Sequence, residues 1–224
     1  MRTIAKFMFR NRGFITFMLC MVIFRSAVAD WNVVPSGSMQ PTIRIGDRIL
    51  VDKLAYDVRV PLTHISLSHL ADPQRGDIVV LDSAAADERL VKRVIGLPGD
   101  EVAMRDNVLI INGHRASYAP SNQHGVHADL LDPAHYKLEH YGALRHVIRV
   151  SDSRPSPASN FGPVIVPAGR YLLLGDDRDN SMDSRYFGFF PRAEIVGRSR
   201  YVVVSLNPQQ HYLPRSGRFG AALD

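Results

Sequence analysis

The sequence VVPSGSMQPTIRIGDRILV, from Val33 to Val51, is the stretch around which the rest of the chain is organised. It places two serines, Ser36 and Ser38, on either side of a glycine and between two prolines. Proline fixes φ and removes a backbone donor, whereas glycine allows φ > 0 and a close approach of a ligand to the main chain. Such a loop can present a hydroxyl as a nucleophile, but Ser/Gly/Pro loops without any chemistry are also common. The role of this loop must therefore be inferred from other parts of the chain.

Two further stretches supply candidate partners for these serines. One is ERLVKRVIGLPGD, from Glu88 to Asp100, and the other is LLLGDDRDNSMDSRYFGFFP, from Leu172 to Pro191. Taken with the serine stretch and in this order, they resemble the type I signal peptidases, which are membrane-bound serine proteases that use a serine and a lysine. The resemblance covers the half of the chain that would hold the active site.

Composition and charge limit the possible partners. The chain has 224 residues, 46% hydrophobic and 22% charged, which is enough for one substantial core or two modest ones. Its formal net charge is +5, but five basic residues precede the first acidic residue, and the remaining 22 basic residues equal the 22 acidic ones. The globular part is therefore neutral. We expect no nucleic-acid partner, because such binding needs an excess of Lys and Arg on the domain itself.

The N-terminus combines basic residues with the apolar run GFITFMLCMVIF, which is about a dozen residues long. This length, followed by Ala27-Val28-Ala29, is typical of a cleavable export signal. Against it, a helix from Gly13 to Trp31 would reach roughly 28 Å, Arg25 can extend towards headgroups, and tryptophan suits the membrane interface. We favour a retained anchor. In either case the positive charge before the apolar run holds the N-terminus in the cytoplasm.

The single cysteine, Cys20, lies inside this apolar run, so the chain cannot form an intrachain disulfide. A thiol nucleophile in the globular part is excluded for the same reason.

Short β-type runs separated by Gly-Asp turns predict antiparallel β structure. The segment from Tyr56 to Gln74 is too short for a domain and is expected to form an extended hairpin or a helical turn. The expected strands are Arg48–Asp52, Asp77–Leu81, Leu90–Ile95, Tyr171–Gly175 and Ile195–Ser205, the last as a long edge or barrel strand.

The fold class we predict is therefore mainly β, an antiparallel catalytic core with an inserted smaller β domain, preceded by one N-terminal transmembrane helix. Residues 1–31 form the basic N-terminus and membrane anchor in this division, and residues 32–100 with 168–215 form the core. Residues 101–167 are the insertion, which the resemblance also implies, and residues 216–224 are a loose tail. Turn chemistry at Asp106-Asn107 and Asn112-Gly113 predicts a hairpin in the insertion.

Several histidines crowd the insertion, where we expect a solvated loop surface rather than a metal site, because their spacing matches no usual ligand pattern. They are His114, His124, His127, His135, His140 and His146.

A serine is a poor nucleophile without a base, and the histidines lie away from the strand-and-turn segments. Lysine is the other choice, and only four occur in the chain. Lys92 stands in LVKRVIG, where strand alternation places it on one face with aliphatic residues and Arg93 on the other. A solvent-facing lysine is the alternative, with Arg93 as a sign that water meets this strand. Lowering a lysine pKa to about 7 takes roughly 4 to 5 kcal/mol, which full burial can supply.

The resemblance assigns roles to residues that match the family's motifs. The serine before methionine, Ser38, is the nucleophile, and Lys92 in K-R-x-x-G-x-P-G-D is the general base. The first serine, Ser36, is the oxyanion-hole hydroxyl, which works with the backbone N–H of Ser38. Ser181, which follows D-N, orients the lysine amine.

The remaining residues of the acidic turn are expected to support the site. Asp183 and Arg185 form a structural ion pair, and Asp176 and Arg178 belong to the same network. Asp177 departs from the pattern, in which asparagine is commoner. We infer that its charge points away from the lysine, because it would otherwise raise the amine pKa.

For the substrate, the resemblance implies secretory preproteins cleaved after a small-x-small tripeptide such as Ala-x-Ala, with the peptide extended beside the Lys92 strand. Main-chain pairing of this kind gives affinity and shallow pockets give specificity. The positions that match the pocket lining are Val34, Met39, Ile43 and Val91.

The sequence as a whole indicates a membrane-bound serine endopeptidase that acts on exported preproteins outside the bacterial cytoplasmic membrane through an acyl-enzyme. No metal or organic cofactor is implied. Specialised pilus-maturation, conjugation or mitochondrial peptidases are alternatives within the same chemistry. An exported β-sandwich binding module whose leader is removed at Ala29 is the alternative from another class.

Overall fold

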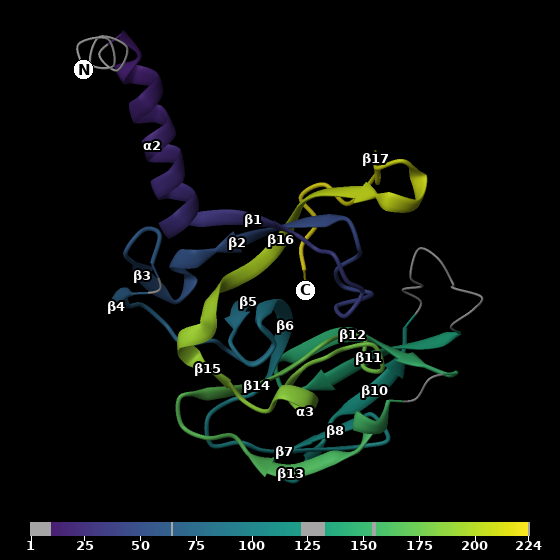
Figure 1. Cartoon of the computed structure of the whole chain (residues 1–224). Coiled ribbons are helices and arrows are strands. Elements are labelled where there is room, and N and C mark those ends of the chain that lie inside the picture. Colours follow the sequence, from purple (N-terminus) through teal and green to yellow (C-terminus); the bar gives the residue numbers. More distant parts are fainter. Residues whose placement is uncertain (1–9, 64, 122–132, 154–155, 224) are drawn as a thin grey trace.

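The structure is a computed structural model that describes residues 10–63, 65–121, 133–153 and 156–223. The described residues fold mainly into antiparallel strands, as predicted, with one long N-terminal helix that projects from the body (Figure 1). The main sheet has the strand order β1-β2-β16-β5-β6-β14-β15. Strands from the two ends of the sequence, β2 and β16, therefore lie side by side in one sheet.

The strands of the main sheet carry the three stretches that the sequence singles out. Their bounds are β1 (Ala29–Val33), β2 (Asp47–Asp52), β5 (Ile78–Ser83), β6 (Glu88–Gly96), β14 (Arg170–Leu174), β15 (Phe190–Pro191) and β16 (Ile195–Asn207), and β17 (Leu213–Pro214) pairs with β16. The five predicted strands are confirmed as β2, β5, β6, β14 and β16. The serine loop lies between β1 and β2, and Lys92 lies on β6.

β16 is not an edge strand, which was one of the two predictions for it. It pairs with β5 through residues 195–199 and with β2 through residues 198–205. The alternating pattern is compatible with either position, because a long strand can leave one sheet neighbour for another along its length.

The C-terminal tail differs from the loose segment that we expected. The N–H of Leu223 donates to the carbonyl of Arg200, and the side chain of Leu223 is buried in the core. Arg218 also bonds to the carboxylate of Asp47. The glycines and prolines of this segment thus permit close packing rather than disorder, because the far half of β16 leaves backbone groups for the tail to pair with.

Two smaller sheets build the region that the sequence marks as an insertion. One has the order β13-β7-β8-β9, and the other has the order β10-β11-β12. The predicted hairpin is confirmed, since both Asp106 and Asn107 take positive φ between β7 and β8, as a tight turn requires. The bounds are β7 (Glu101–Arg105), β8 (Val108–Ile111), β9 (His114–Arg115), β10 (Ser117–Pro120), β11 (Ala134–Tyr141), β12 (Leu144–Ser151) and β13 (Phe161–Ile165).

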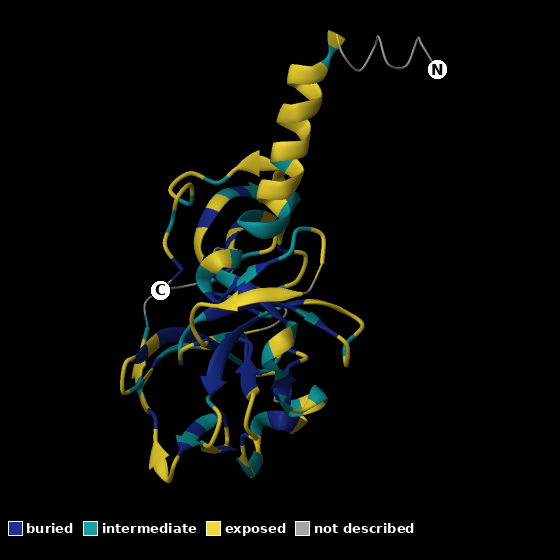
Figure 2. Ribbon diagram, turned by 90° about the vertical axis from the view of Figure 1, so that its left-hand side faces the viewer, coloured by how far each residue is buried: buried dark blue, intermediate teal, exposed yellow. Residues whose placement is uncertain are grey.

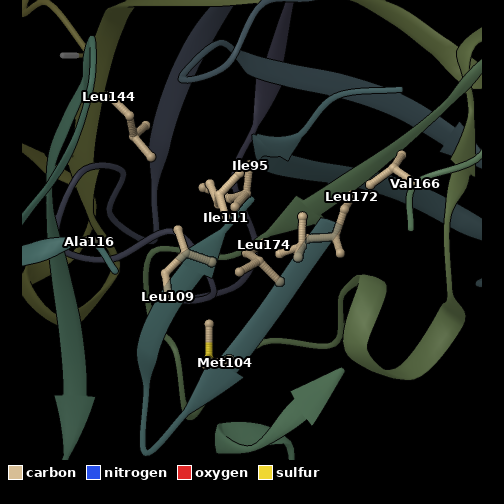
Figure 3. Packing of buried hydrophobic residues seen from close by; sticks show 10 residues of the cluster. Ile95, Met104, Leu109, Ile111, Ala116, Leu144, Val166, Leu172 and Leu174 are labelled. Atoms are coloured by element: carbon tan, nitrogen blue, oxygen red, sulfur yellow. The ribbon is translucent and has the colours of Figure 1, made fainter. Parts of the chain in front are cut away.

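Three clusters of buried apolar side chains form the core. One joins the inserted sheets to the ends of β6 and β14, with Leu109 and Ile111 packed near Ile95, Leu172 and Leu174 (Figure 3). A second lies beneath the serine loop, and the third fills the space around β5, β6 and β14. The strand that carries Lys92 is therefore packed against core on both faces.

The N-terminal helix α2 (Arg12–Ala27) is shorter than the Gly13 to Trp31 helix that we expected. It ends at Ala27, and Ala29 already pairs with Asp52 in the main sheet. Among the residues that the structure describes, no helix combines the length and apolar character needed to cross a membrane. None of the residues of α2 is buried, and Figure 2 shows the helix standing clear of the body.

The segment from Tyr56 to Gln74 contains a hairpin of β3 (Asp57–Arg59) and β4 (Ser66–His69), which matches the first of the two expected structures. These two strands form a sheet of their own. They lie below the C-terminal end of α2 (Figure 1).

Candidate active site

The structure brings Ser38 and Lys92 together from distant parts of the chain. Lys92 Nζ lies 2.9 Å from Ser38 Oγ, and the two residues are separated by 54 positions in the sequence. The serine is held by the loop that joins β1 to β2, and the lysine projects from the middle of β6. No other hydrogen bond of Lys92 Nζ is found within the described residues, so this contact fixes where the amine points.

Lys92 is only 3% exposed, and its strand neighbours on the same face, Leu90 and Val94, are buried aliphatic residues. Val79 of β5 lies directly across from it in the sheet. Burial lowers the pKa of Lys92 to about 8, because the charged amine loses its hydration. The negative charge of Asp183 raises the pKa of Lys92, and the positive charge of Arg185 lowers it, both by less than burial does. About a tenth of the amine is therefore neutral at pH 7, far more than for an ordinary lysine.

Ser36 lies next to the pair. Its Oγ is 3.5 Å from Ser38 Oγ, and either hydroxyl can be the donor. The two hydroxyls thus face the same space, which the PSGS sequence achieves because two residues separate them in a tight loop.

The loop that carries Ser38 is fixed from below by the acidic turn between β14 and α3 (Ser184–Phe187). The N–H of Asp177 donates to the carbonyl of Ser38 at 3.0 Å. Gly175 is required at its position, because a Cβ there would clash with both the carbonyl of Ser38 and the hydroxyl of Ser181. This close approach explains why a glycine begins the turn.

Ser181 is buried close to this point, and its side chain is one of the groups that lower the pKa of Asp183. The hydroxyl thus lies beside both the Ser38 backbone and the Asp183 carboxylate. It does not hydrogen-bond to the amine of Lys92 in this structure.

Asp183 and Arg185 form a fully buried ion pair with two hydrogen bonds of 2.8 Å. Asp183 also accepts from the N–H of Gly175 and caps α3. Burial raises the pKa of Asp183, but the guanidinium of Arg185 outweighs this and holds the pKa below its ordinary value. The pair therefore fixes the turn in the geometry that places Gly175 and Ser181 under the serine loop.

Arg93, the neighbour of Lys92, is buried rather than in contact with water, which corrects the solvent-facing alternative. Its guanidinium makes two hydrogen bonds to Asp176, at 2.9 and 2.8 Å. Asp176 also accepts from Thr42 of the serine loop at 2.5 Å. One carboxylate from the acidic turn thus joins the lysine strand to the serine loop.

Arg178 extends the network into the insertion. It forms a fully buried, bidentate pair with Glu139 of β11, at 2.7 and 2.5 Å. Tyr118 of β10 donates to the same carboxylate at 2.6 Å. Removing one partner of a buried pair typically costs about 3–5 kcal/mol, so this pair ties the insertion firmly to the acidic turn.

His146 contradicts the prediction of a solvated histidine surface. Its side chain is fully buried, with Nε2 at 3.5 Å from Glu139 and 3.6 Å from Asp176. Burial and the nearby charge of Arg93 lower the pKa of His146 to about 4, so it is neutral at physiological pH. Two of the six histidines, His124 and His127, lie outside the described residues. Within the described part of the chain, no cluster of three or more ligand-type side chains could hold a metal ion.

Asp177 hydrogen-bonds to the guanidinium of Arg149 on β12, at 3.1 and 3.2 Å. It is not among the principal charges that shift the pKa of Lys92. This agrees with the inference that its carboxylate points away from the amine.

The four pocket candidates gather in one place. Val34, Met39 and Ile43 belong to the apolar cluster beneath the serine loop, and Val91 packs against it. Met39 and Ile43 are 1% and 0% exposed, so they form a packed floor rather than an open surface.

Sequence reasoning missed the partners that the insertion and the loop contribute. These are Thr42, Glu139, His146 and Arg149. A glutamate and a histidine in alternating strand patterns read as solvent-facing residues, and only their cross-strand pairing, Glu139 with His146, places them on the buried face. No local signal in the sequence gives that register.

Comparisons with known proteins show the family of this chain. The family model of the signal peptidases, peptidase S26, matches residues 9–204. A signal peptidase I of Pseudomonas fluorescens is 36% identical over 94% of this chain and 77% of its own length. A "Signal peptidase I P" of Bacillus subtilis subsp. natto is 30% identical over 87% of each chain. A solved signal peptidase I structure from Enterococcus faecalis has 30% sequence identity and a TM-score of 0.35, and it covers 58% of this chain and 97% of its own.

The fold and the site define a class of protein. It is an antiparallel β protein in which a serine hydroxyl on a loop contacts a buried lysine amine, and a network of ion pairs supports both residues. Within that class, the chain belongs to the signal peptidase I family, the S26 serine peptidases. It is therefore an enzyme, which decides against the exported binding module.

Proposed function

We propose that this protein removes N-terminal signal peptides from exported preproteins, with Ser38 as nucleophile and Lys92 as general base. The observation that carries the proposal is the 2.9 Å separation of Ser38 Oγ and a buried amine whose pKa is lowered to about 8. A nucleophilic serine needs an adjacent base of this kind.

In the first step, the neutral amine of Lys92 accepts the proton of Ser38 as Oγ attacks the scissile carbonyl. The resulting ammonium then gives the proton to the leaving amine, and an acyl-enzyme remains on Ser38. In the second step Lys92 takes a proton from water as that water attacks the ester. The ammonium then returns the proton to Ser38 Oγ as the acyl group leaves, which restores the free serine and the neutral amine. The aliphatic walls around the amine serve both steps, because they keep its pKa near the working pH.

We assign the oxyanion hole to the Ser36 hydroxyl together with the N–H of Ser38. The support is that the Ser36 and Ser38 oxygens lie 3.5 Å apart and face one space. Donors placed before the reaction stabilise the tetrahedral intermediate without reorganisation. Ser181, whose buried hydroxyl lies under the serine loop, is assigned to orienting the Lys92 amine once a substrate excludes water.

The preference for small side chains is assigned to the apolar floor beneath the serine loop. Because Met39 and Ile43 are fully packed, a large substrate side chain would have to displace core atoms. A floor of this kind excludes by clash rather than by loss of attraction.

Membrane attachment is assigned to α2 and the basic residues before it. Its apolar side chains are exposed, with Phe14 66% and Leu19 58% accessible, and Arg25 stacks over Trp31 at 4.3 Å where the helix meets β1. The catalytic body would lie on the outer side of the bacterial cytoplasmic membrane, because the positive charges precede the apolar run.

The test is cleavage of a preprotein with an Ala-x-Ala site, with the new N-terminus identified by mass spectrometry. We expect one cut, directly after the second alanine. A matched preprotein that carries Phe in place of that alanine should be cut at least roughly 10²-fold more slowly, since clash with a packed floor is costly. Equal rates for the two substrates would refute the assigned pocket, and no cleavage of either would refute the function.

A further inference from the structure

The tip of the β3–β4 hairpin exposes large apolar side chains that the proposed chemistry does not use. Leu62 is 76% exposed, Ile65 is 62% exposed and Leu67 is 67% exposed. Every residue of β4 is solvent-exposed, and among the described residues its one sheet partner is β3. Exposed apolar groups gathered in this way usually mark an interaction surface.

The hairpin tip is joined to the C-terminal end of α2. The N–H of Leu62 donates to Ser26 Oγ at 2.5 Å, and Ser26 belongs to the last turn of the helix. Leu62 and Thr63 also line a small cavity together with Ser26 and Ala27. The apolar tip and the end of the apolar helix are therefore neighbours, as Figure 1 also indicates.

The base of the hairpin is fixed to the main body, so the tip is presented rather than free to fold back. Asp57 pairs with Arg192 at 3.0 Å, and Arg59 donates to the carbonyl of Ile195 at 2.6 Å. Directly after β4, the N–H of Leu70 donates to the carbonyl of Tyr56, a core residue, at 2.9 Å. Because its base is fixed, the hairpin holds the apolar side chains of its tip in an exposed position.

Charge identifies the partner as a lipid surface. Residues 58–71 contain no Asp or Glu, and neither does the chain before Asp30, although the whole sequence has 22 acidic residues. Carboxylates would be repelled by anionic headgroups and are costly to dehydrate, so their absence from both neighbouring segments suits a bilayer.

We propose that the β3–β4 hairpin is a second membrane contact, whose tip side chains Leu62 and Ile65 enter the bilayer interface beside the end of α2. This inference rests on the proposed attachment through α2 and adds to it. Two contacts at different positions fix the orientation of the body, whereas a single helix leaves it free to rotate. The hairpin would thus hold the serine loop at a constant height above the lipid, where the end of a signal peptide emerges.

The experiment places a single tryptophan at the tip. The chain has one tryptophan, so Trp31→Phe gives a silent background for Leu62→Trp. The control is Ile165→Trp, because Ile165 is 67% exposed and belongs to β13, a strand at the far end of the molecule from α2 (Figure 1). Full-length protein is mixed with vesicles of phosphatidylethanolamine and phosphatidylglycerol, with or without brominated acyl chains. We expect a blue shift and bromine quenching at position 62 and neither at position 165.

A second variant tests the energy of the contact. The double variant Leu62→Asp, Ile65→Asp should weaken vesicle binding by roughly tenfold or more, since two apolar side chains that enter the bilayer interface become charged. Ile165→Asp should leave vesicle binding unchanged. The wild type, the double variant and Ile165→Asp should all cleave a short soluble peptide at the same rate.

Three results would overturn the inference. If the chain co-sediments with vesicles but position 62 is not quenched, the hairpin contact is wrong and attachment through α2 stands. If the chain does not bind vesicles at all, both fail, while cleavage of the soluble peptide still reports on the peptidase. If the blue shift depends on protein concentration and not on vesicles, the surface binds a second copy of the chain.

Discussion

Lys92→Met is expected to lower the rate of preprotein cleavage by roughly 10⁴-fold or more while leaving the fold intact. Methionine has nearly the shape of lysine without the amine, so no group remains within 2.9 Å of Ser38 Oγ to take its proton. The variant should also be at least as stable as the wild type, because the buried site no longer has to hold an amine that prefers water. The measurements are single-turnover cleavage and thermal unfolding.

The matched control for this variant is Lys137→Met. Lys137 lies on β11, away from the serine loop, so this change should leave cleavage near the wild-type rate. Lys92→Arg should be as inactive as Lys92→Met, since a guanidinium stays charged at all working pH values. Near-normal turnover of either Lys92 variant would assign the base to another group.

Ser38→Ala is the second change with a very large expected effect, again roughly 10⁴-fold or more on the rate. The hydroxyl that forms the acyl-enzyme is lost, and residual activity could come only from water attacking within the same site. The variant should still bind preprotein, because Ser38 contributes one small hydroxyl to a surface made mainly of backbone and apolar groups. Cleavage and binding of a labelled preprotein measure the two effects separately.

Ser36→Ala gives a graded comparison with Ser38→Ala. It should slow cleavage by roughly 10²–10³ without abolishing it, since one oxyanion donor is removed and the backbone donor remains. If Ser36→Ala were as inactive as Ser38→Ala, the nucleophile and the oxyanion donor could not be told apart and the assignment of Ser38 would lose its support.

Five strands of the main sheet, β2, β5, β6, β14 and β16, were predictable because their alternation is strong and their turns contain Gly and Asp, whereas β1, β15 and β17 were not predicted. The face on which Lys92 lies was predictable for the same reason, and its burial agrees with the aliphatic neighbours in LVKRVIG. Its contact with Ser38 could not be read from spacing, because 54 residues separate the two and only the assembled sheet brings them together.

Buried charge was where sequence reasoning failed. Arg93 indicated that one face of the Lys92 strand contacts water, and the histidines of the insertion indicated a solvated surface. In both cases the deciding partner comes from a distant segment: Asp176 from the acidic turn for Arg93, and the carboxylates around His146. A charged residue on a strand is buried when a distant segment supplies its counter-charge. The local sequence pattern does not indicate which segment that is.

The chain ends were the other source of error. The helix stops at Ala27 because the following residues, Ala29 to Val33, pair with β2 and so become part of the sheet. The tail pairs with the exposed half of β16 in a similar way. Backbone pairing at a sheet edge depends on which strands remain unpaired after folding, and side-chain patterns carry little information about it.

Direct titration of the Lys92 amine tests the central claim most closely. The ¹³Cε chemical shift of selectively labelled lysine, followed by NMR across pH and assigned with Lys92→Met, reports the protonation of each lysine separately. We predict a midpoint of about 8 for Lys92, so that the neutral base, and with it the cleavage rate, grows as the pH rises towards that value. A midpoint at the ordinary value of 10.5 would contradict the account, because the amine would then be charged wherever the enzyme works.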